Sequence, residues 1–151
     1  MRKYLAILAA LTAFAITHDN AAQARDSSYG AVAIDTSRIA ISGHRHLAQA
    51  LKPMLAGELS KALGPRLGRT GAAITVRITY LRIPPNAGED NTDGVIEDTL
   101  EGVVIVPGRA PIPIRVMLPP GNAGAWYTKG FDERRVFRLI EAFAQWTARE
   151  V

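Results

Sequence analysis

Hydrophobic side chains recur along the chain with two periods, one typical of helices and one typical of strands. Leucine occupies every fourth position from Leu47 to Leu63, and this spacing predicts an amphipathic helix over residues 44–63. The pair Gly64-Pro65 follows directly, as expected where a helix ends. We expect Pro53 to kink this helix or to mark its effective start.

A second helix is predicted near the end of the sequence. Asp132 has a side chain suited to an N-cap, and apolar residues with helical spacing follow it. The face that we expect to pack on the core consists of Val136, Leu139, Ile140, Phe143 and Trp146. We expect this helix to pack on the same face of the sheet as the first one.

Residues 72–83 have the clearest strand pattern, because apolar and polar side chains alternate along them. The residues expected to face the core are Ile74, Val76, Ile78 and Tyr80. Residues 29–41 alternate less regularly, since the apolar phase changes part-way along. They predict a strand with a break or bulge near residues 35–37.

Residues 100–106 and 112–118 predict a β-hairpin joined through Pro107-Gly108-Arg109. Pro113 places the second of these strands at a sheet edge, because proline cannot donate a hydrogen bond to a ladder. The element order is therefore β-α-β-β-β-α. We expect an α+β two-layer sandwich, with two helices on one face of a mostly antiparallel sheet and one domain over residues 25–151.

The first 24 residues have the three parts of a cleavable signal peptide. Arg2 and Lys3 form a basic start, residues 4–16 are apolar, and Ala22-Gln23-Ala24 offers small side chains to signal peptidase. The apolar run is shorter than the roughly 20 residues that a bilayer-spanning helix needs. The sequence contains no cysteine, which excludes a disulfide and a cysteine-linked lipid. We therefore expect cleavage before Arg25 and a periplasmic or secreted location.

Charge and titratable residues limit the chemistry that we expect. The 18 basic and 14 acidic residues are spread along the chain, so we expect no nucleic-acid partner. His44 and His46 are two positions apart, whereas a helical metal pair needs four. Ser42 near His44 has neither a glycine-flanked turn nor an orienting carboxylate. We predict no catalytic residue, no metal and no cofactor.

Acidic side chains gather in residues 89–98, which we expect to form a solvated loop: Glu89, Asp90, Asp93, Glu97 and Asp98. The stretch that begins at Asp90 is similar to a calcium-binding loop. Thr92 and Gly94, however, stand where that loop requires Asp or Asn. We therefore expect no cation site there.

The glycine-rich segment 119–130 contains the best candidate for partner binding. Its Trp126 and Tyr127 are large aromatic side chains of the kind that anchor protein interfaces. The preceding strand would add unpaired backbone groups, so we predict a partner-binding surface formed by Trp126, Tyr127, Ile112 and Ile114. The alternative is that Trp126 folds back over the core and covers the start of the last helix.

The leader, the element order and the leucine-striped helix followed by a strand resemble small α+β envelope domains. These are the lipopolysaccharide-assembly lipoprotein LptE and the auxiliary lipoproteins of ABC-type lipid transporters. Leu100-Glu101-Gly102, Gly124-Ala125-Trp126-Tyr127 and Glu133-Arg134-Arg135 are also similar to segments of uncharacterised exported alphaproteobacterial proteins. The resemblance implies an envelope location, and the lack of a lipid-bearing cysteine departs from the lipoproteins.

We therefore expect an exported, non-catalytic envelope domain with a binding or adaptor role. Its partner would be either an envelope protein or a lipid. Two alternatives stay open. One is an apolar-ligand or lipid-binding periplasmic protein with a cleft between helices and sheet. The other is a hydrolase whose site has no recognisable motif. The sequence leaves the oligomeric state open.

Export predicts a defined product. The chain recovered from the periplasm should have an intact mass that corresponds to a start at Arg25, because signal peptidase cleaves after the small residue Ala24. Cell fractionation followed by mass spectrometry measures this. A chain that stays in the cytoplasm with its first residues intact would contradict the assignment.

Overall fold

The computed structural model describes residues 29–41, 45–68, 71–84, 97–125 and 127–151. Its four-stranded sheet has the order β1-β2-β3-β4, where the strands are β1 Tyr29–Asp35, β2 Ala72–Arg82, β3 Asp98–Ile105 and β4 Ile112–Leu118. β1 and β2 run parallel, whereas the β2–β3 and β3–β4 pairs are antiparallel. The mostly antiparallel sheet and the hairpin that ends it are confirmed.

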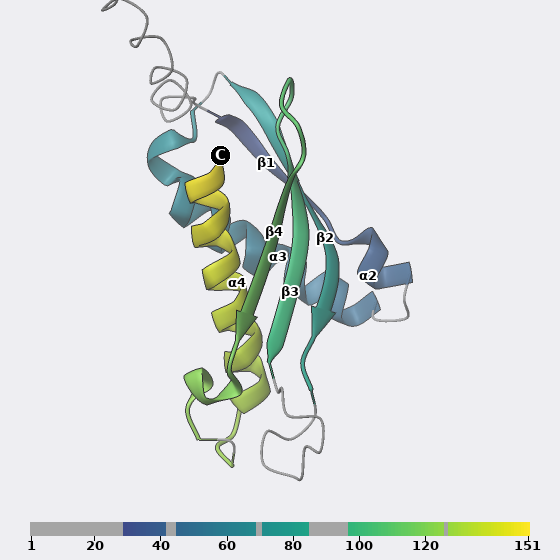
Figure 1. Cartoon of the computed structure of the whole chain (residues 1–151), viewed down its shortest axis with the longest axis vertical. Helices are drawn as coiled ribbons and strands as arrows, with labels where there is room; N and C mark the ends of the chain where they lie inside the picture. Colours follow the sequence, from purple (N-terminus) through teal and green to yellow (C-terminus); the bar gives the residue numbers. More distant parts are fainter. Residues whose placement is uncertain (1–28, 42–44, 69–70, 85–96, 126) are drawn as a thin grey trace, which may run out of the picture.

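Two long helices pack on one face of this sheet and against each other (Figure 1). They are α3 Arg45–Leu63 and α4 Phe131–Glu150, and shorter helical segments are α2 Ser37–Ile41, η1 Gly64–Arg66 and η2 Pro120–Ala123. The predicted order β-α-β-β-β-α is confirmed, with α2 as an addition. No helix in the described part of the chain combines the length and the apolar composition that a membrane crossing requires.

The leucine stripe of α3 forms one wall of the core, as predicted. Leu51 is 1% exposed, and Leu55, Leu59 and Leu63 are fully buried against the inner face of the sheet. Pro53 lies inside the helix at an exposed position, so it does not mark the start of the helix. The predicted end is confirmed, because η1 begins at the residue after Leu63.

The prediction of a strand over residues 29–41 is wrong in its second half. β1 ends at Asp35, and α2 occupies the remaining positions. The Asp35 carboxylate accepts hydrogen bonds from the backbone N–H of Ser37 at 3.0 Å and from its hydroxyl at 2.6 Å, which turns the chain into a helix. Ile39 then packs into the core with 4% of its surface exposed. The change of apolar phase thus marks a change from strand to helix.

A bulge in β2 reverses the alternation that the sequence predicted. Ile78 pairs with Gly102 and Tyr80 pairs with the neighbouring Glu101, so β2 holds one residue more than β3 at this point. Tyr80 therefore turns away from the core and is 45% exposed. Leu81 packs against the core in its place. The prediction that Tyr80 faces the core is wrong, because an inserted residue flips every later side chain.

Gly102 allows α4 to approach the sheet beside this bulge. A Cβ atom at this position would lie 2.7 Å from the carbonyl oxygen of Arg77 and 2.9 Å from the ring of Phe143. Both distances are shorter than real Cβ contacts, so only glycine fits without a shift of backbone or helix.

Asp35 makes the stability of this region depend on pH. Hydrogen bonds from the Ser37 hydroxyl and backbone, and then from Arg77 at 2.8 Å, lower the pKa of Asp35 from 3.8 to about 2. Because the folded pKa lies below the unfolded one, the charge stabilises the fold fully above pH 3.8. That contribution is lost as the pH falls through about 2.

Asp35→Asn keeps an acceptor for Ser37 and removes the charge. The variant should be about 1–2 kcal/mol less stable than the unmodified protein near neutral pH, with a difference that shrinks toward zero as the medium becomes strongly acidic. Urea unfolding at a series of pH values measures both. A difference that does not change with pH would contradict the assigned role of the charge.

Candidate binding groove beside the edge strand

Three of the four predicted partner-binding residues, Ile112, Ile114 and Tyr127, lie in the described part of the chain and differ in their exposure to solvent. β4 is the last strand of the sheet, so the predicted edge position is confirmed. Ile114 is 5% exposed and packs in the core, and Ile112 is half-buried on the same face of β4. Tyr127 is 75% exposed, and Trp126 lies outside the described residues. The edge can therefore offer its backbone to a partner, but not the side chain of Ile114.

Arg134 ties the glycine-rich segment to α4. Its Nε donates to the carbonyl oxygen of Ala123 at 2.9 Å, and its Nη1 donates to that of Lys129 at 2.8 Å. Its Nη2 donates to the hydroxyl of Thr128. The Arg134 guanidinium thus connects the end of η2 to the residues that directly precede α4. Tyr127 lies between these two attachment points in the sequence.

The predicted N-cap of the last helix is wrong. α4 begins at Phe131 after Gly130, whose φ of 76° lies in the left-handed region that favours glycine. Asp132 is inside the first turn, and its carboxylate forms an ion pair with Arg135 at 2.9 Å. A glycine turn, rather than a side-chain cap, therefore starts α4.

Arg135 and Asp98 form a buried ion pair that the sequence analysis missed. Their side chains are 1% and 2% exposed. Nε and Nη2 of Arg135 donate to the two carboxylate oxygens at 2.9 Å and 2.5 Å, and Nη2 also donates to the carbonyl oxygen of Pro84 at 3.0 Å. The available signal was positional: Arg135 precedes Leu139 by four residues and Asp98 precedes Leu100 by two, so both occupy core-facing positions.

This pair changes the interpretation of the acidic segment 89–98. Asp98 does not belong to a solvated loop, because it opens β3 and is buried. Burial opposes the charge of Arg135, but hydrogen bonds with Asp98 and Asp132 outweigh it and hold the pKa of Arg135 above its ordinary value. Both oxygens of Asp98 are engaged by Arg135, so this carboxylate is not free to act as a base.

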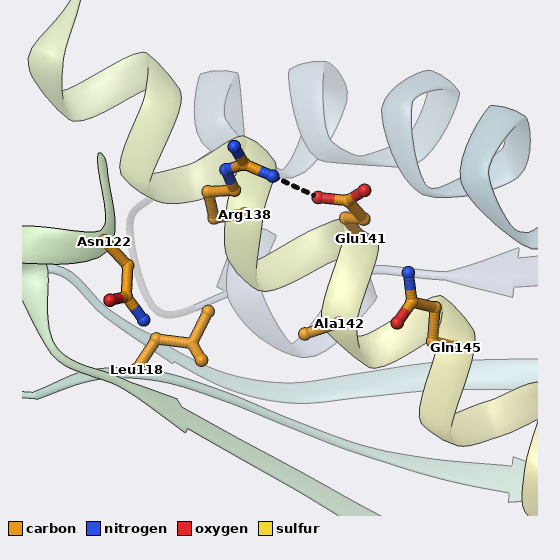
Figure 2. Close-up of a pocket in the computed structure, with 6 residues that line it drawn as sticks. All are labelled: Leu118, Asn122, Arg138, Glu141, Ala142 and Gln145. Atoms are coloured by element: carbon orange, nitrogen blue, oxygen red, sulfur yellow. Dashed lines mark hydrogen bonds and ion pairs between the residues drawn. The ribbon is translucent and has the colours of Figure 1, made fainter. Parts of the chain in front are cut away.

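A groove of about 440 Å³ opens between β4, η2 and α4 (Figure 2). On its α4 side, Nη1 of Arg138 and Oε2 of Glu141, one helical turn apart, form an ion pair of 2.9 Å. The two side chains are 55% and 34% exposed, and such pairs contribute only about 0.2–1 kcal/mol. A charged ligand can therefore displace either partner. The lining residues are Leu118, Asn122, Arg138, Glu141, Ala142 and Gln145.

A partly exposed tryptophan lies near the C-terminal end of α4. Trp146 follows Ala142 by one helical turn, is 48% exposed, and has the guanidinium of Arg149 at 5.5 Å from its ring centroid. The prediction that Trp146 packs on the core is therefore wrong.

The other residues considered for chemistry are not gathered into a site by the described structure. His46 is exposed near the start of α3, whereas Ser42, His44 and most of the acidic segment lie outside the described residues. Within the described ranges, no group of three or more His, Cys, Asp and Glu side chains is placed to hold a metal ion.

The chain matches no family model and no curated protein sequence. A structural comparison pairs it with the crystal structure of "a putative lipoprotein from Caulobacter crescentus CB15". The TM-score is 0.38 and the sequence identity 14%, over 86% of this chain and 88% of the other. A likeness at this distance assigns neither a family nor an activity.

The buried ion pair predicts a large and specific loss of stability. Arg135→Met leaves the Asp98 carboxylate buried without a partner and should cost about 3–5 kcal/mol in urea unfolding. The matched control is Arg138→Met, which breaks an exposed pair and should cost less than about 1 kcal/mol. A double variant with Arg135→Met and Asp98→Leu should regain much of the loss. Equal costs for the two single variants would contradict the role of the buried pair.

Proposed function

We propose that this protein is an exported, non-catalytic binding domain of the cell envelope that holds an extended segment of a partner protein. The segment would lie along the free edge of β4 and place side chains in the adjacent groove. The observation that supports this proposal is the position of the groove, which begins at Leu118 at the end of the edge strand. The signal-like first 24 residues support export.

The backbone of β4 suits strand addition in its second half. β4 pairs with β3 on one side and is the terminal strand of the sheet, so its other side carries backbone groups that no strand in the described part of the chain pairs. Pro113 offers no N–H and limits pairing at the start of β4. Residues 114–118 contain no proline and lead directly to the groove. Backbone pairing there would supply affinity, and the groove would supply selectivity.

The groove suits a peptide better than an acyl chain. Four of its six lining residues are polar or charged, namely Asn122, Arg138, Glu141 and Gln145. Sites for apolar ligands are enclosed and lined mainly by hydrophobic side chains. The lining therefore favours a partner protein over a lipid tail.

Site-specific cross-linking in the intact cell tests this function. The photo-reactive residue p-benzoylphenylalanine would replace Gln145 in the groove or, as a control, the exposed Gln49 on α3. We expect the groove position to cross-link to an exported protein and the control position to give no such product. Ala142→Trp, which fills the groove, should lower the yield at least roughly fivefold, whereas Ala50→Trp on α3 should not.

A thermal melt of each variant establishes that the tryptophan substitutions leave the fold intact, and Asn122→Trp is a second way to fill the groove. Equal cross-linking from both helices, or products that contain only lipid, would overturn the proposed function.

A further inference from the structure

We infer that the partner segment is acidic and that Arg138 and Arg115 select it from the two faces of the edge strand. This inference rests on the proposed function and adds the chemical character of the partner. The relevant observations are the distribution of charge along the chain and the placement of these two exposed arginines.

Two of the three net positive charges of the exported chain lie in the part that forms the binding surface. Without the buried pair of Arg135 and Asp98, residues 106–151, which supply β4, η2 and α4, contain six basic and four acidic side chains, and residues 25–105 contain nine basic and eight acidic ones. The larger excess of positive charge is therefore in residues 106–151. A partner that approaches β4 and α4 meets a surface that favours negative charge.

The two arginines lie on opposite faces of the sheet edge. Ile114 and Val116 face the core, so Arg115 between them points to the face opposite the two long helices, where it is 62% exposed. Arg138 lies on α4 at the groove. Side chains of a strand added to β4 would alternate between these faces, and each face would present an arginine to them.

Both arginines are paired with glutamates that an acidic segment can replace. Arg115 contacts Glu101 at 3.1 Å and Arg138 contacts Glu141 at 2.9 Å, and all four side chains are at least one-third exposed. Exposed pairs of this kind are weak, so incoming carboxylates can exchange with the resident ones. Glu101 and Glu141 therefore compete with the partner.

The same geometry disfavours a membrane surface as the occupant. A flat anionic bilayer can contact one face of a sheet, but Arg115 and Arg138 lie on two. A strand that continues the sheet has side chains on both faces and also pairs with the free backbone of β4. An extended acidic peptide can form hydrogen bonds with the free backbone of β4 and ion pairs with both arginines at the same time.

A peptide array provides the test. Protein purified from the periplasm would be applied to peptides that tile the exported proteins of the source organism, and affinities of the bound peptides would be measured in solution. We expect the bound set to be enriched in Asp and Glu at least roughly twofold over the array. We also expect the affinity to fall when the salt concentration is raised.

Charge variants test the two arginines in both directions. Arg138→Glu and Arg115→Glu should each weaken binding of the acidic peptides about fivefold to tenfold, and Arg45→Glu on α3 should change it less than about twofold. Glu141→Gln and Glu101→Gln should each strengthen binding about twofold to fivefold, because they remove the competing carboxylates. A loss of folding cannot produce this strengthening.

The outcomes separate the inference from the function on which it rests. If the bound peptides show no enrichment in Asp and Glu, but Ala142→Trp still weakens their binding, the inference is overturned and the proposed function stands. Acidic peptides that bind to both arginine variants as tightly as to the unmodified protein would also overturn it. Binding to vesicles of anionic phospholipid in place of peptides, lost in Arg138→Glu, would replace it with a lipid surface. Binding to no peptide, together with no groove cross-link, would overturn the proposed function as well.

Discussion

The ion pair between Arg135 and Asp98 determines where the last helix can lie on the sheet. Each of its members would be costly to bury alone, by several kcal/mol, and each is almost wholly inaccessible to water. α4 must therefore meet β3 where one guanidinium can reach both carboxylate oxygens. The same guanidinium donates a hydrogen bond to the carbonyl oxygen of Pro84, so the residues that follow β2 are held beside the ion pair as well.

Contacts at its other turns hold α4 along β4. Arg109, in the hairpin between β3 and β4, donates to the carbonyl oxygens of Val151 at 3.4 Å and of Glu150 at 3.5 Å at the end of the helix. Arg134 holds η2 to the start of the helix. The groove between α4 and β4 thus has walls that are fixed at both ends. A partner would bind a surface that already has its shape, with less conformational entropy to lose.

The hydrophobic pattern was sufficient to predict the main elements and their order. The leucine stripe of α3 and the hairpin that ends in β4 depend on neighbours within a few residues, through helical spacing and through the glycine and proline at the turns. Pro113 identified the edge strand because the lack of an N–H is a property of the residue itself. The edge half of the candidate site was therefore accessible from the sequence.

Tertiary structure decided the positions at which contact between distant segments outweighs the local pattern. The bulge that turns Tyr80 outward depends on pairing between β2 and β3, and the burial of Arg135 depends on a carboxylate 37 residues away in the chain. Trp146 is 48% exposed although it has the helical spacing of the buried residues of α4, which periodicity within α4 cannot show. The groove combines Leu118 from β4 with Ala142 from α4, so it exists only once the helix has been placed against the sheet edge.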